Sequence, residues 1–107
     1  GRPALTEWTL LEPLRGASLL DVHILTGRTH QIRVHMQSVG HPVAGDPLYG
    51  LRHGVATPRL LLHAHTLQFT HPRTGERLRL EAPLPPDFLA ALRKLRWDPT
   101  APLRLTP

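Results

Sequence analysis

Apolar and polar residues alternate in two stretches near the start of the chain. Residues 6–12 alternate so that Trp8 and Leu10 share one side. A Pro-Leu-Arg-Gly turn follows at 13–16, and residues 18–25 then alternate again. The positions of this second stretch that we expect to face inward are Leu20, Val22 and Ile24. The pattern predicts an antiparallel hairpin that leads the chain into the glycine-containing turn at 26–29.

A helical period replaces the alternation after this turn. Ile32, Met36 and Val39 recur at the spacing of one helix face. Thr29 is the expected N-cap, because its hydroxyl can accept hydrogen bonds from the unpaired N–H groups of the first turn. Gly40 follows the last periodic position and is the expected helix stop. The pattern therefore predicts a short amphipathic helix.

The second half of the chain predicts another hairpin and another helix. Residues 60–70 alternate over the length of a long strand, and residues 77–82 alternate as its partner after a turn at 71–75. A proline-rich break leads into a helix near 87–96. Its expected buried stripe consists of Phe88, Leu92 and Leu95. The fold class is therefore α+β, with mainly antiparallel strands and two helices.

Composition narrows the range of functions. The formal net charge is +5, and Lys94 is the single lysine among the thirteen Lys and Arg residues. Arginine suits phosphate and base edges, so this charge favours a polyanionic partner such as RNA. A biased genome would produce the same arginine content, so charge alone does not distinguish an RNA partner from compositional bias. The chain has no cysteine, and no apolar run approaches the length of a membrane span, so we expect a cytoplasmic setting.

The predicted helix start offers an anion site. Arg28 lies beside the free N–H groups of the first helical turn, which carry partial positive charge. An ordinary capped helix with a solvated polar face explains the spacing equally well. Asp46 has two readings as well, since it either accepts backbone N–H groups in a turn or pairs with a nearby arginine.

Eight histidines raise the possibility of a metal site. His63 and His65 share one side of a predicted strand, a spacing that zinc sites use. The same side carries apolar residues, so a histidine with a backbone partner is the stronger interpretation. His30 and His35 point in different directions around a helix. No carboxylate completes a ligand set, and we expect no metal.

Several motifs, in order and at matching spacing, resemble the RluA-type pseudouridine synthases. Residues 26–35 read TGRTHQIRVH and residues 40–50 read GHPVAGDPLYG. Further matches are LHAH at 62–65, FTHPRTGE at 69–76 and APLPPDF at 82–88. The resemblance runs from about residue 4 to about residue 95. It implies that residues 1–97 are the C-terminal half of a pseudouridine synthase catalytic domain, with residues 98–107 as a mobile tail.

The resemblance also implies an activity and the residues that serve it. Such enzymes isomerise uridine to pseudouridine in structured RNA, rRNA or tRNA, without a metal or another cofactor. Their catalytic aspartate acts on the ribose, and the uracil detaches, rotates and rejoins through carbon. Arg33 would pair with that aspartate. The expected RNA-binding residues are Arg28, Thr29, His30 and Gln31, and the expected apolar wall of the uridine pocket is formed by Leu60, Leu61 and Leu62.

The family's aspartate lies in an upstream His-Arg-Leu-Asp segment that these 107 residues do not contain. We therefore expect the partner of Arg33 to come from elsewhere and this chain alone to be inactive. We also expect Leu20 and Val22 to be open to water, because the missing N-terminal half of the domain normally covers them. Two alternatives remain: a non-catalytic RNA-binding module on the same scaffold, and a small histidine–metal protein.

Overall fold

The computed structural model describes residues 4–25, 30–50, 57, 59–70 and 72–106. Within these ranges the elements follow in the order β1 (Thr6–Pro13), β2 (Ser18–Ile24), α1 (Gln31–Ser38), β3 (Thr66–Thr70), β4 (Arg77–Glu81) and α2 (Pro86–Leu95). The described strands pair in two antiparallel sheets of two strands each. The predicted α+β class is confirmed. None of the described helices is long and apolar enough to cross a membrane.

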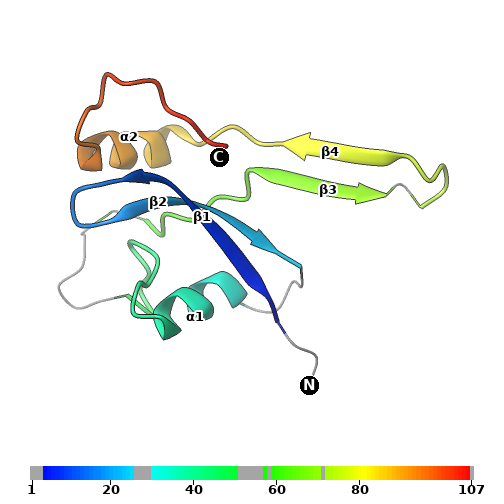
Figure 1. The fold of residues 1–107 in the computed structure, drawn as a ribbon, viewed down its shortest axis with the longest axis horizontal. Helices are drawn as coiled ribbons and strands as arrows, with labels where there is room; N and C mark the ends of the chain where they lie inside the picture. Colours follow the sequence, from blue (N-terminus) through cyan, green and yellow to red (C-terminus); the bar gives the residue numbers. More distant parts are fainter. Residues whose placement is uncertain (1–3, 26–29, 51–56, 58, 71, 107) are drawn as a thin grey trace.

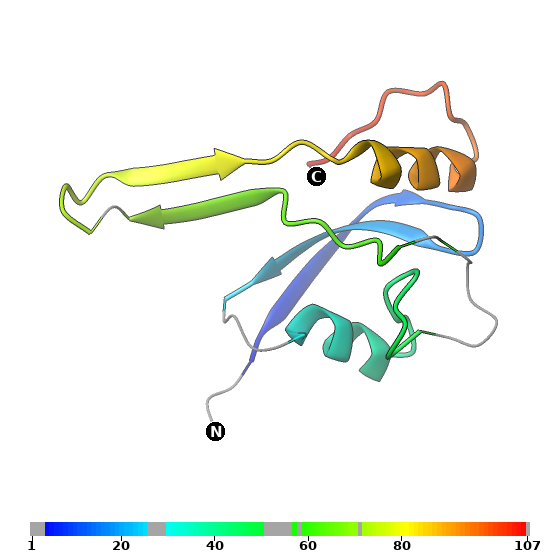
Figure 2. The ribbon, with the colours of Figure 1, turned by 180° about the vertical axis from the view of Figure 1, so that it is seen from behind.

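The β1–β2 hairpin lies between the two helices. In both views α2 runs along one side of the hairpin and α1 lies on the opposite side (Figure 1 and Figure 2). The β3–β4 hairpin extends away from this body (Figure 1). The chain between α1 and β3 therefore has to cross from the α1 side of the first hairpin to the α2 side.

The first hairpin forms as the alternation predicts. Trp8 pairs with Val22 and Leu10 with Leu20, with a bulge after Leu10. Its turn contains Gly16 at φ 68°, a conformation that favours glycine. Leu20 and Val22, which we expected to be open to water, are half-buried. The exposed apolar surface lies instead on their partners, because Trp8 is 57% and Leu10 49% exposed.

The α1 helix begins one residue later than predicted. His30 is the N-cap, with φ 53°, and it makes no side-chain capping bond. Thr29, the predicted cap, lies outside the described residues. The predicted stop is confirmed: Gly40 has φ 84° and its N–H donates to Gln37 O at 3.0 Å, while His41 N–H donates to Met36 O at 2.9 Å. These two bonds form a Schellman motif.

The second hairpin is shorter than the alternation predicts. β3 covers Thr66–Thr70, whereas residues 60–65 have no strand pairing. The prediction of a strand from residue 60 was therefore wrong, because β4 ends at Glu81 and offers partners only as far back as Thr66. Leu80, expected to face inward, is 55% exposed. The pairing of β3 with β4 is antiparallel, as predicted.

The hydrophobic core lies where α2 packs against the turn of the first hairpin. Leu14 of the turn packs with Phe88 and Leu92 of α2, and Leu95 lies against the same cluster. This confirms the stripe predicted for α2. Pro86 stands in the first turn of the helix, where its missing N–H costs nothing.

A buried arginine after α2 forms an ion pair with β1. Arg96 is only 7% exposed, and its Nε and Nη2 donate to the two oxygens of Glu12 at 2.7 and 2.9 Å. These hydrogen bonds lower the pKa of Glu12. Arg96 Nη1 donates to Ala101 O at 2.9 Å, and Leu103 packs against the core cluster. The mobility expected for residues 98–107 stays a prediction, although these contacts attach residues 101 and 103 to the body.

Candidate functional site

The α1 helix presents Arg33 to the loop that follows it. Arg33 Nε donates to Asp46 Oδ2 at 2.8 Å and Nη2 donates to Asp46 Oδ1 at 2.8 Å. The arginine side chain is 13% exposed and the aspartate side chain is fully buried. A planar guanidinium fits a carboxylate in this two-bond geometry, so the pair fixes the loop to the helix.

The buried carboxylate also organises its own turn. Asp46 Oδ1 accepts hydrogen bonds from the backbone N–H groups of Leu48 at 2.9 Å and Tyr49 at 3.1 Å. The bonds from Arg33 and from these N–H groups hold the pKa of Asp46 well below its usual range, against the opposing effect of burial. Asp46 is therefore a carboxylate at neutral pH. Both readings of Asp46 in the sequence are confirmed together.

Arg33 has a partner in the described residues that we did not expect. We expected an aspartate from another segment, and the structure pairs Arg33 with Asp46 of this chain. A further contact of Arg33 with the catalytic aspartate stays a prediction. The pairing follows from tertiary packing across thirteen residues, which periodicity does not encode. One signal in the sequence points to it: Asp46 is the only acidic residue between Asp21 and Glu76.

Two aromatic rings lie beside the charged pair. The Tyr49 ring centre is 5.4 Å from the guanidinium carbon of Arg33, which is the geometry of a cation–π contact. The His30 ring meets Tyr49 edge-on with centroids 6.2 Å apart. His30 is exposed and Tyr49 half-buried. The cluster of His30, Arg33, Asp46 and Tyr49 thus offers a cation and aromatic surface next to solvent, and we call it the α1 cluster.

Gln31 has a structural role that the predicted RNA contact does not include. Its side chain is 4% exposed, and its amide donates to Leu5 O at 3.0 Å and to Thr6 Oγ1 at 3.1 Å. Thr6 Oγ1 also bonds to His35 Nδ1 at 2.5 Å. These bonds attach α1 to the start of β1. The prediction that Gln31 binds RNA is corrected, because a buried amide bonded to the backbone does not face a ligand.

The predicted pocket wall lies next to the Asp46 loop. Leu60, Leu61 and Leu62 are all half-buried. Leu61 N–H donates to Ala44 O at 2.9 Å, and the Leu61 side chain packs against the core cluster. The backbone of the wall is therefore fixed two residues from Asp46. Whether these residues line a uridine pocket stays a prediction.

The remaining predictions concern the RNA-binding residues of the helix start and a histidine metal site. Arg28 and Thr29 lie outside the described residues. His63 Nε2 and His65 Nδ1 lie 2.8 and 3.0 Å from Ala82 O, so both rings have a backbone partner. In the described ranges, no three potential metal ligands come together.

These features define a basic α+β unit whose first helix and following loop form one charged, partly exposed cluster. Comparison with known proteins then shows which proteins the chain resembles. The chain is 46% identical over 104 residues to a ribosomal large subunit pseudouridine synthase D from Nitrosomonas europaea. It is 47% identical over 96 residues to an RNA pseudouridine synthase, YlyB, from Bacillus subtilis. It is 44% identical over 102 residues to a ribosomal large subunit pseudouridine synthase C from Pasteurella multocida.

The extent of these matches is as informative as their identity. Each covers 90% of this chain and 30–32% of the relative. No protein-family model matches the chain. The resemblance to RNA pseudouridine synthases that the motifs predicted is thus confirmed, and the chain corresponds to about a third of the length of the curated relatives it matches.

Proposed function

We propose that this chain forms part of an RNA pseudouridine synthase that isomerises uridine in structured RNA, rRNA or tRNA, in the cytoplasm. The observation that carries the proposal is the 42–47% identity to proteins of that name over about 90% of the chain. Two of the relatives described above are named for the large ribosomal subunit, which favours rRNA. The net charge of +5 supports a polyanionic substrate.

The α1 cluster supports a role close to the reacting nucleotide. Asp46 occupies the Nε and Nη2 side of Arg33, and within the described residues Nη1 makes no hydrogen bond. That side of the guanidinium can take a second anion, either a phosphate of the RNA or a carboxylate from a segment outside these residues. The paired Asp46 keeps the cation in place while Tyr49 covers one of its faces. We propose that the catalytic aspartate comes from such a segment.

A hybrid protein tests this proposal. The part of the Nitrosomonas europaea relative that precedes its matched region is joined to residues 1–107 and incubated with RNA whose uridines carry tritium at C5. Tritium is released when the base rejoins the ribose through C5, so release measures the isomerisation. We expect release by the hybrid and none by residues 1–107 alone. Activity of the isolated chain would contradict the external aspartate.

The unmodified relative and its preceding part alone are the matched controls for this assay. Release by the relative with none from a folded hybrid would contradict the proposed function. Binding of RNA by residues 1–107, together with an inactive hybrid, would favour the non-catalytic binding module instead.

Arg28 tests the phosphate contact that the motif predicts. We expect Arg28→Ala to weaken RNA binding by residues 1–107 and to reduce the slope of log affinity against log salt by about one, since one phosphate contact is lost. Titrations of a structured RNA at several salt concentrations measure both effects. Arg93→Ala, which removes an exposed arginine from the last turn of α2, is the control. An unchanged slope for Arg28→Ala, or an equal loss for Arg93→Ala, would contradict the role.

A further inference from the structure

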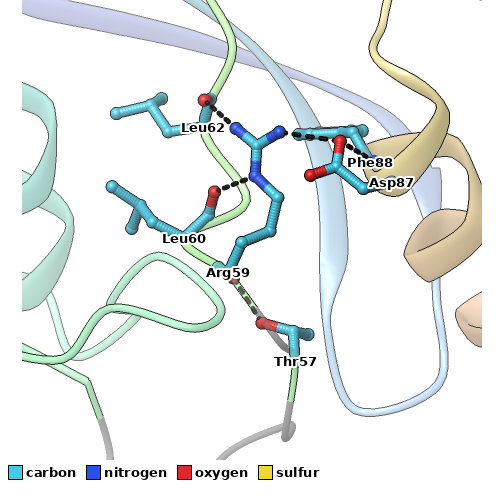
Figure 3. Close-up of polar contacts among 6 residues, drawn as sticks. All are labelled: Thr57, Arg59, Leu60, Leu62, Asp87 and Phe88. Atoms are coloured by element: carbon cyan, nitrogen blue, oxygen red, sulfur yellow. Dashed lines mark hydrogen bonds and ion pairs between the residues drawn. The ribbon is translucent and has the colours of Figure 1, made fainter.

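Arg59 makes polar contacts in three directions. Its Nε donates to Leu60 O at 2.9 Å, its Nη2 to Leu62 O at 3.4 Å and its Nη1 to Asp87 Oδ1 at 3.0 Å (Figure 3). The guanidinium carbon lies 5.9 Å from the centre of the Phe88 ring. One side chain thus connects the irregular segment 60–62 with the first turn of α2.

The carbonyl groups of this segment depend on that side chain. Residues 60–65 have no strand pairing, so Leu60 O and Leu62 O have no ladder partner. A guanidinium presents N–H donors in a rigid planar fork and can hold two carbonyls at a fixed separation. A lysine has one nitrogen on a flexible stem and cannot reproduce this arrangement. The conformation of the segment therefore rests on the shape of Arg59 as well as on its charge.

The backbone of Arg59 is held from the opposite side. Thr57 Oγ1 donates to Arg59 O at 2.6 Å. Gly45 packs so closely there that an added Cβ would lie 2.0 Å from Arg59 O. Leu61 N–H donates to Ala44 O at 2.9 Å. Since Asp46 follows Gly45 directly, Arg59 lies in a continuous set of contacts that reaches the α1 cluster.

The contacts of Arg59 contribute little to overall stability. Asp87 is 58% exposed and the Arg59 side chain 30% exposed, so their ion pair is screened by water. The buried core is formed by other residues, chiefly Leu14, Phe88 and Leu92. The main effect of Arg59 is therefore to fix the position of residues 60–62 relative to the Asp46 loop.

We propose that Arg59 is a positioning residue, which holds the backbone of Leu60–Leu62 at a fixed place beside the α1 cluster so that this segment can act as the wall of the uridine site. This inference rests on the proposed function for the identity of the substrate. The holding of the segment itself rests on the contacts of Arg59 alone. The two parts therefore have separate tests.

Amide hydrogen exchange of residues 1–107 tests the holding of the segment. We expect Arg59→Lys to speed exchange of the Leu61 amide by about tenfold or more, while the Arg96 amide, bonded within the end of α2, keeps its rate. Asp87→Asn, which removes the ion pair and leaves both carbonyl bonds, should change Leu61 by less than about twofold. An unchanged Leu61 rate in Arg59→Lys, or an equal rise at Arg96, would overturn the inference.

Single-turnover kinetics of the hybrid tests the consequence for catalysis. With enzyme in excess, a misfolded fraction lowers the amount of active enzyme, whereas a displaced pocket wall lowers the rate constant. We expect Arg59→Lys to lower the rate constant by about tenfold to a hundredfold at an unchanged amplitude, and Asp87→Asn to keep both. A loss confined to the amplitude would overturn the positioning role. If the unsubstituted hybrid is inactive, the proposed function fails, and hydrogen exchange still decides whether Arg59 holds the segment.

Discussion

Gly45→Ala is expected to lower the free energy of unfolding by about 3 kcal/mol. Gly45 has φ 78°, and a side chain in that region costs roughly 1–2 kcal/mol. The new Cβ would also lie 2.0 Å from Arg59 O and 2.8 Å from the Arg59 carbonyl carbon, both backbone atoms that cannot rotate away. Overpacking of this kind adds about 1–3 kcal/mol. Chemical denaturation of residues 1–107 measures the difference.

Gly75→Ala is the matched control for this substitution. Gly75 has φ 71°, nearly the same conformation, but a Cβ there would meet nothing within 4 Å. It should therefore show only the conformational cost, roughly 1–2 kcal/mol. Equal losses for the two variants would mean that the Asp46 loop and Arg59 are not in close contact in solution, and the positioning argument for Arg59 would lose its support.

Asp46→Asn should have an effect of similar size, with a distinctive pH dependence. The amide cannot accept both bonds from Arg33, so a largely buried cation loses its partner, and breaking such a pair costs about 3 kcal/mol. The folded-state pKa of Asp46 lies below its unfolded value of about 4. Its stabilising contribution is therefore complete above that unfolded value and is lost as the pH falls from there toward the folded-state pKa.

The measurement for Asp46 is a pair of stability curves between about pH 7 and pH 2. We expect the difference between the native chain and Asp46→Asn to be constant above about pH 4 and to shrink on further acidification. Glu12 and Asp98 also have lowered pKa values, so both proteins will lose stability in acid and only the difference is diagnostic. Asp87→Asn, at an exposed ion pair, should lie close to the native curve. Parallel native and Asp46→Asn curves would contradict the role of the carboxylate.

Local patterns in the sequence predicted the elements whose partners are close along the chain. The first hairpin follows from alternation on both sides of Gly16, and α2 follows from Phe88, Leu92 and Leu95 at helical spacing. The end of α1 follows from Gly40, because only a residue that tolerates a positive φ completes the Schellman motif. In each case the physical cause lies within a few residues of the element.

Specific hydrogen bonds of polar side chains account for what the sequence did not predict. Residues 60–65 alternate like a strand, but β4 does not pair with them. The Arg59 side chain instead donates hydrogen bonds to two of their carbonyl groups. Gln31 was expected to bind RNA, but its amide donates to the backbone at the start of β1. Arg33 was expected to pair with an aspartate from another segment, but Asp46 of this chain accepts two of its hydrogen bonds. Hydrophobic periodicity does not predict these bonds. Gln31 and Arg33 bond to polar groups far along the chain, and Arg59 bonds to backbone carbonyls of its own segment.

The bond between Arg96 and Glu12 spans 84 residues, which sets the order of events as the protein is synthesised. The first hairpin leaves the ribosome before α2, so its turn residue Leu14 stays uncovered until α2 has been made. At about 5–20 residues per second this interval lasts roughly 4–16 s. During that time Leu14, which packs with Leu19 in the folded protein, is uncovered, and so are Trp8 and Leu10, which pair with Val22 and Leu20. These apolar side chains of the nascent chain are where a chaperone would be expected to bind.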